Sequence, residues 1–134
     1  MGRFLRSISL VFAAGCVGAV FNSLAVWLFG RFGISAALGV NIAPALSPGW
    51  LYPRAVWGGL WGLLFLLPVL QGSVLGRGLL FSLGPSLVQL LVVFPYQAHK
   101  GVLGLALGTL TPVLVLAFNA VWGVFAALWV RLAK

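Results

Sequence analysis

The stretch GISAALGVNIAPALSPGWLYPR, residues 33–54, decides how many times this chain crosses a membrane. It is apolar enough to enter a bilayer, yet Gly39, Asn41 and Pro44 interrupt it, and the run SPGWLYP imposes a turn. A full span here would place Asn41 and Pro44 near mid-membrane and put the termini on opposite sides. A plain outer loop packed on the bundle and a fifth span are alternatives. Because irregular backbone at membrane depth needs protein or a wet cavity around it, we expect an interfacial or re-entrant hairpin that contains Asn41 and Pro44.

The composition on both sides of this stretch is that of an integral membrane protein. Of the 134 residues, 63% are hydrophobic and only 6% are charged, whereas a soluble domain is about half apolar and a quarter charged. A membrane span needs about 20 apolar helical residues to cross about 30 Å of hydrocarbon. The segments that meet this need are 8–29, 55–70, 74–94 and 106–130. The sequence therefore predicts one all-α transmembrane domain over residues 1–134, a four-span helix bundle with residues 33–53 as the interfacial or re-entrant segment between the first two spans.

The cationic side chains have no acidic side chain to pair with, because the sequence contains eight Lys and Arg but no Asp or Glu. Each cation must face water, a lipid phosphate, a backbone carbonyl or another protein. Anionic lipids attract a basic residue at the membrane surface by about 1 kcal/mol. We therefore expect anionic membrane lipids as the main partner, with an acidic partner subunit as the alternative.

The positions of the cations predict the orientation of the chain. A cytoplasmic N-terminus would leave five cations inside (Arg3, Arg6, Arg77, Arg131 and Lys134) and three outside (Arg31, Arg54 and Lys100). The positive-inside rule favours this arrangement, so both termini are expected in the cytoplasm of a bacterial inner membrane. The three outer cations are the candidates for binding a lipid phosphate.

The first residues, MGRFLRSISLVFAAGC, have the basic start, apolar run and small residues of a bacterial lipoprotein signal that ends at Cys16. The apolar run continues beyond Cys16 as VGAVFNSLAVWLFG. A cleaved signal would leave only a truncated apolar stump. We therefore expect one uncleaved helix with Cys16 inside it.

Glycines four residues apart mark two expected helix contacts. Gly58 and Gly62 lie in WGGLWG, and Gly104 and Gly108 lie in GLALG. Small residues at this spacing form a flat strip that lets helix backbones come close. We expect both pairs to pack within the chain, and a homo-oligomer interface is the alternative.

Polar residues inside the predicted spans follow one pattern. Ser82, Ser86 and Gln89 share one helical face because they are four and three residues apart. Asn22 in the first span and Asn119 in the fourth are expected to turn toward them, since amides supply both donors and acceptors. We interpret the set as hydrogen-bonding glue between helices, and a neutral lining for a solute path is the alternative. Proton-coupled transport through this chain alone is not expected, because the spans contain no Asp, Glu or His.

This composition does not predict an enzyme. General acid–base catalysis needs titratable groups beside the reacting bond, and the chain offers one cysteine in the first span and one histidine, His99, in a loop. A metal site would have too few ligands, and no nucleotide-binding fingerprint occurs. The cations are scattered at span ends and form no basic surface for nucleic acid. No cofactor, metal or nucleic-acid partner is expected.

These features lead to two functional hypotheses. The first is a small accessory, assembly or lipid-interacting subunit, working as a homo-oligomer or within a larger membrane complex. The second is a small transporter or channel subunit for a neutral or anionic solute. The broken segment 33–54, the polar stripe and the position of Arg54 at its mouth favour the second hypothesis.

Overall fold

The computed structural model describes residues 2–133, and its regular elements are all helical. The principal helices are α1 (Gly2–Arg31), α3 (Pro48–Trp61), α4 (Val74–Val88) and α5 (Thr111–Ala133). The shorter elements are α2 (Ile34–Ala37), the 3₁₀ segments η1 (Gly62–Leu66) and η3 (Val102–Leu107), and the π-helical segment η2 (Gln89–Gln97). Residues 2–133 contain no strand, so the all-α prediction is confirmed.

Three helices are long and apolar enough to cross a membrane: Gly2–Arg31, Val74–Gln97 and Thr111–Ala133. The second of them joins α4 to η2. These helices support an integral membrane protein that passes through the bilayer more than once. The first is longer than the predicted span 8–29 at both of its ends.

The predicted span 55–70 begins too late and ends too late. The helix starts at Pro48, where Ser47 is the N-cap and its side chain accepts a hydrogen bond from the Trp50 amide at 3.3 Å. Proline is favoured at the first helical position because its missing N–H is not needed there. Residues 48–53, assigned from sequence to the interfacial segment, are therefore helical. At the other end, η1 stops at Leu66.

The predicted span 106–130, in contrast, begins before the helix does. Leu103 and Gly104 have left-handed φ angles of 61° and 69°, which kink η3 and interrupt the right-handed helix, and α5 starts only at Thr111. Gly104 and Gly108 therefore do not form a helix-packing pair, and that prediction is wrong. Gly104 instead packs against the ring of Phe94, and Gly108 lies against the backbone of Gly39.

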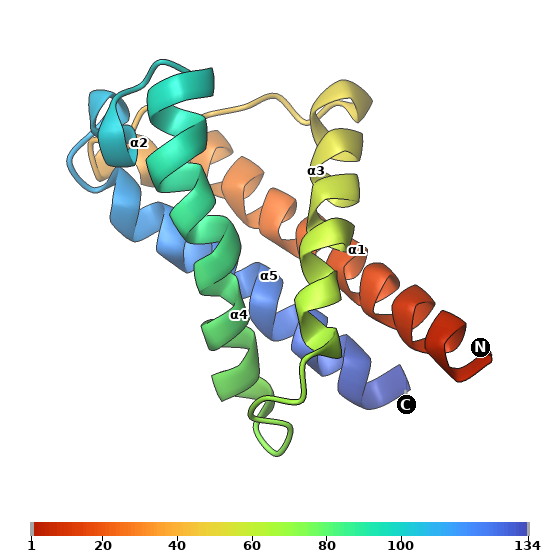
Figure 1. Ribbon diagram of the computed structural model, residues 1–134. Coiled ribbons are helices and arrows are strands. Elements are labelled where there is room, and N and C mark those ends of the chain that lie inside the picture. The colour runs from red at the N-terminus through yellow and green to blue at the C-terminus, as the bar shows by residue number, and fades with distance from the viewer. Residues whose placement is uncertain (1, 134) are drawn as a thin grey trace.

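Helices α1 and α5 cross at the centre of the bundle, with α3 packed on α1 and α4 packed on α5 (Figure 1). Glycines make both outer contacts close. A methyl group added at Gly58 would lie 2.5 Å from the Cβ of Ala19 in α1. One added at Gly78 of α4 would lie 2.6 Å from the carbonyl oxygen of Gly123 in α5. Gly62 also lies against the α1 backbone, so the Gly58 and Gly62 pair packs within the chain.

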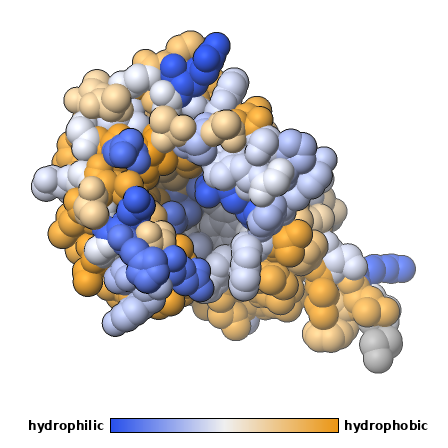
Figure 2. Space-filling view, turned by 90° about the horizontal axis from the view of Figure 1, so that it is seen from above, coloured by the Kyte–Doolittle hydropathy of each residue, from blue (hydrophilic) through white to orange (hydrophobic). Residues whose placement is uncertain are grey.

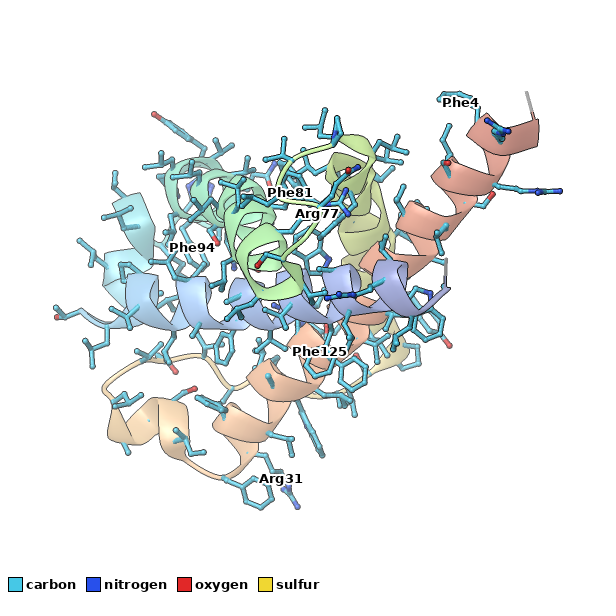
Figure 3. The ribbon with its side chains drawn as sticks, turned by 90° about the horizontal axis from the view of Figure 1, so that it is seen from below. Phe4, Arg31, Arg77, Phe81, Phe94 and Phe125 are labelled. Carbon is cyan, nitrogen blue, oxygen red and sulfur yellow. The ribbon has the colours of Figure 1, made fainter. Side chains whose placement is uncertain are left out.

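The end of the bundle that holds both termini is filled by apolar side chains around Arg77 (Figure 3). The Arg77 guanidinium donates to the carbonyl oxygens of Phe65 at 2.6 Å and Leu67 at 3.0 Å. Its central carbon lies 5.3 Å and 5.7 Å from the ring centroids of Phe65 and Phe81. Arg77 is only 7% exposed. Two backbone carbonyls at the end of η1, one of the kinds of partner expected for the cations, therefore bind Arg77.

At the opposite end, α3 and the continuous α4–η2 helix diverge (Figure 1). An extended chain crosses this end and connects α2 to α3. The backbone N–H of Asn41 holds the extended chain in place by donating to the Leu107 carbonyl at 2.8 Å. Val40 is buried beside it. Residues 33–47 thus consist of one helical turn followed by extended backbone.

Candidate functional site: a polar cleft between α3 and α4–η2

Two adjoining cavities of about 400 and 420 Å³ lie between the diverging helices. Four residues line both cavities: Asn22, Arg54, Gln89 and Asn119. We call the two cavities together the cleft. Seen from above, the molecule is hollowed, and hydrophilic side chains lie around the hollow together with hydrophobic ones (Figure 2). The size of each cavity lies within the range of ordinary small-molecule sites.

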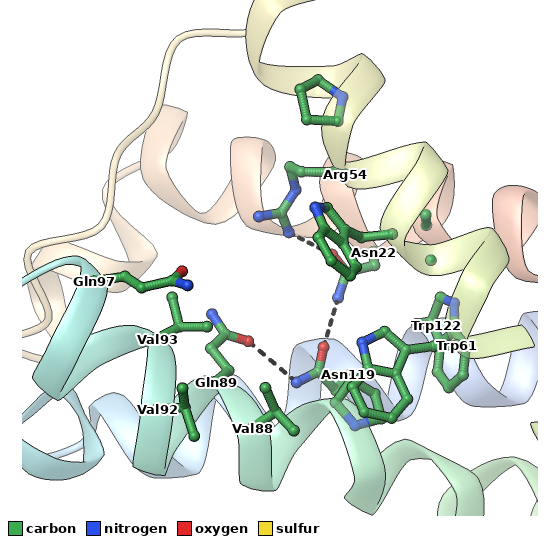
Figure 4. Close-up of a pocket in the computed structure, with 15 residues that line it drawn as sticks. Asn22, Arg54, Trp61, Val88, Gln89, Val92, Val93, Gln97, Asn119 and Trp122 are labelled. Atoms are coloured by element: carbon green, nitrogen blue, oxygen red, sulfur yellow. Dashed lines mark hydrogen bonds between the residues drawn. The ribbon is translucent and has the colours of Figure 1, made fainter.

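Arg54 projects from α3 into the cleft (Figure 4). Its Nε donates to the Ser23 hydroxyl at 2.9 Å, and its Nη2 donates to Oδ1 of Asn22 at 2.6 Å. The guanidinium carbon lies 4.7 Å from the ring centroid of Trp50. All three partners are neutral, and the sequence has no acidic side chain that could approach. Because a partly buried charge is costly without a counter-charge, the cleft has an uncompensated positive site.

A chain of amides forms the floor of the cleft. Asn22 donates to the Phe118 carbonyl at 2.6 Å and to Oδ1 of Asn119 at 3.4 Å. Asn119 donates to the Ser86 hydroxyl at 3.1 Å and to Oε1 of Gln89 at 3.3 Å. These bonds connect α1, α5 and the α4–η2 helix, and Arg54 adds α3 (Figure 4).

The structure brings together four of the five polar residues that the sequence placed in the interior. Asn22, Ser86, Gln89 and Asn119 form the network described above. Ser82 is buried but donates only to the Leu79 carbonyl of its own helix, at 2.7 Å. Sequence reasoning did not identify Ser23 and Trp50 as contacts of Arg54. The position of Ser23 beside Asn22 was the only available signal.

Two of the three candidate lipid-phosphate residues line the same cavity. Arg54 and Lys100 line the outer one, together with Asn41 and Pro44 from the extended chain. Lys100 is exposed at the rim. Arg31 lines neither cavity and extends into solvent from the end of α1 (Figure 3). The three cations therefore do not form one cluster.

The other cavity has mainly apolar walls. Trp57 and Trp61 of α3 face Pro85, Val88 and Val92 of the α4–η2 helix across it. Gln97 adds a polar group from the last turn of η2. Wide π-helical turns occur often at functional sites, and η2 supplies one wall here. The cleft thus combines a cation and amides, which can bind an anion, with a separate wall that is apolar.

The residues considered for catalysis lie elsewhere. Cys16 packs against Gly59 of α3, and His99 is exposed in the loop after η2. Neither residue lines the cleft. No family model, curated protein or solved structure matches this chain.

Proposed function

We propose that this chain is a small multi-pass membrane protein that holds an anionic group in its cleft and acts as an accessory or lipid-interacting subunit of a membrane complex. The observation that carries the proposal is Arg54, which is partly buried and, among residues 2–133, is hydrogen-bonded only to neutral side chains. An anion would supply the missing counter-charge. Lys100 on the same cavity would strengthen the attraction.

The proposed topology has four spans, with α3 and η1 as the second. The 14 residues of α3 and the 5 of η1 rise about 31 Å at helical and 3₁₀ spacing. This length matches the hydrocarbon core of about 30 Å. An even number of spans agrees with the position of both termini at one end of the bundle (Figure 1).

The cations support a cytoplasmic location for the end that holds the termini. Arg3, Arg6 and Arg131 are exposed there, and Lys134 lies outside the described residues. The positive-inside rule places this end in the cytoplasm, for which a bacterial inner membrane is the proposed setting. The cleft would then open on the outer side, and residues 33–47 would lie in the outer interface.

Anion binding is tested by titrating the protein with inorganic phosphate in nanodiscs of zwitterionic lipid, with isothermal calorimetry as the readout. Hydrogen bonds from a charged donor contribute about 1.5–3 kcal/mol. Arg54→Gln should therefore weaken binding by about tenfold or more. Arg31→Gln is the matched control, because it removes a cation that does not line the cleft. Equal binding by wild type and Arg54→Gln would refute the proposal.

Transport of a neutral or anionic solute is the second candidate function. It is favoured by the amide floor, which extends inward from the mouth of the cleft to Gln89 and Asn119. A path across the membrane would also have to open the apolar cluster around Phe65, Phe81 and Trp122. In a liposome flux assay, transport predicts that Gln89→Leu or Asn41→Leu abolishes flux without unfolding the protein. If the amides serve only as glue, Gln89→Leu should change stability alone, because Gln89 is bonded to Asn119.

A further inference from the structure

The two cavities of the cleft differ in chemistry. The outer cavity carries both cations, Arg54 and Lys100, and the polar side chain of Asn41. The inner wall of the other cavity is formed largely by tryptophan, valine and proline side chains. A small hydrophilic anion would use only the first. A ligand that fills both must have an anionic end and an apolar end.

The two cavities meet at a common set of side chains. Asn22, Arg54, Gln89 and Asn119 line both. Arg54 therefore lies at the junction, where a charged headgroup would contact it while its apolar part continued along the other wall. The network that connects Arg54 to Asn22 and Asn119 fixes the guanidinium at this point.

The apolar cavity is open at the side of the bundle. Its lining residues Trp57, Val88 and Val92 are 64%, 37% and 45% exposed. They belong to α3 and to the α4–η2 helix, the two helices that diverge. In a bilayer this opening faces the hydrocarbon, so an acyl chain could pass through it without leaving the membrane.

We propose that the occupant of the cleft is one anionic membrane lipid, and this inference rests on the proposed anion-binding function. Its headgroup lies between Arg54 and Lys100, and one acyl chain leaves between α3 and the α4–η2 helix. Lipid tails are as apolar as the side chains they would touch, so the groove itself adds little affinity. The charge at Arg54 selects anionic over zwitterionic lipid. The acyl chain in the groove holds the headgroup at the membrane depth of the guanidinium.

Lipids with brominated acyl chains test this arrangement, because bromine quenches the fluorescence of nearby tryptophan and Trp57 and Trp61 line the groove. The protein is placed in zwitterionic nanodiscs with a small fraction of brominated lipid, either anionic or zwitterionic. The anionic lipid should quench at a mole fraction about tenfold lower than the zwitterionic one, the ratio expected for a charge-assisted contact. Arg54→Gln should remove this preference, and Arg31→Gln should retain it.

A second pair of variants tests the groove separately from the charge. Val88→Phe narrows the apolar cavity, whereas Leu87→Phe adds the same ring at a neighbouring exposed position that does not line it. Val88→Phe should keep the acyl chain away from Trp57 and Trp61 and so lose the preferential quenching by anionic lipid, but it should still bind inorganic phosphate. Leu87→Phe should retain both.

The other outcomes overturn the inference. Phosphate binding that depends on Arg54, without any preference between brominated lipids, would mean that the ligand is a free anion, and the proposed function would stand. Failure of the wild type to bind either phosphate or anionic lipid would refute both proposals. If Val88→Phe leaves the preferential quenching by anionic lipid unchanged, the acyl chain does not occupy the groove.

Discussion

The replacement Asn119→Leu tests whether the amide network holds the helices together. Asn119 makes three interhelical hydrogen bonds, to Asn22 at 3.4 Å, Ser86 at 3.1 Å and Gln89 at 3.3 Å. Interhelical bonds in a membrane protein average about 0.6 kcal/mol each, so their loss should cost about 2 kcal/mol. Leucine has a similar size, so no large cavity term adds to this value.

The structure also limits the cost to that range. After the substitution Asn22 still donates to the Phe118 carbonyl and accepts from Arg54. Ser86 still donates to the Ser82 carbonyl, at 2.7 Å. Gln89 loses its partner but lines the cleft and is only partly buried. No fully buried polar side chain is thereby left without a hydrogen bond, which would cost a further 1–3 kcal/mol or so.

Reversible unfolding in mixed micelles of a mild detergent and dodecyl sulfate measures this difference. Ser82→Ala is the control, because Ser82 bonds only within its own helix. It removes one hydrogen bond and should lower the free energy of unfolding by about 0.6 kcal/mol, well below the loss expected for Asn119→Leu. A loss below about 0.5 kcal/mol for Asn119→Leu would show that the network does not stabilise the bundle. A loss of about 4 kcal/mol or more would mean that the protein depends on it far more than these bonds allow.

Three further outcomes are expected from the same structure. Gly78→Ala should destabilise the protein by about 1–3 kcal/mol in the same unfolding assay, because its methyl group would press on Gly123. Gly72→Ala, which meets nothing within 4 Å, should be close to neutral. Arg77→Gln should make the loop after η1 more sensitive to limited proteolysis, because two carbonyls lose a charged donor; unchanged cleavage would contradict this role. In a background without the native cysteine, an impermeant thiol reagent should label Ser47→Cys from outside and Gly72→Cys only from inside, and labelling of both from one side would exclude the four-span topology.

Much of the helical architecture could be predicted because it depends on local properties of the chain. Long apolar runs with few charges can cross a membrane only with their backbone groups paired, and helices satisfy that requirement. The polar stripe was also predictable from local sequence, because the spacing of Ser82, Ser86 and Gln89 places them on one helical face. Asn119, which donates to Ser86 and Gln89 of this stripe, was the only amide side chain in the predicted last span.

The features that the sequence did not reveal depend on tertiary contacts. Gly78 and Gly123 are not part of any four-residue glycine pair, and their contact exists only because α4 crosses α5 at that point. The GLALG motif looked helical, but left-handed backbone at Leu103 and Gly104 breaks it. The role of Arg77 depends on carbonyls left free where η1 ends.

Arg54 shows how far sequence reasoning reached for the candidate site. The sequence placed it just before the predicted span 55–70, whereas the structure has it within α3. A role in binding phosphate was also predicted from the sequence and stays a prediction. Sequence could not show that α3 and the α4–η2 helix diverge around it, because this depends on which helices the glycines bring into contact. Close packing of α3 on α1 and of α4 on α5 thus leaves a cleft around Arg54, where α3 and the α4–η2 helix diverge.

We propose that Arg54 makes the cleft a site for an anion. Native mass spectrometry of the protein, extracted gently from its own membrane, tests it most directly by counting the anionic lipids retained on each chain. We predict a defined anionic lipid on the wild type and on Arg31→Gln, and its loss from Arg54→Gln. The same lipid retained at the same occupancy by Arg54→Gln would contradict this role of Arg54.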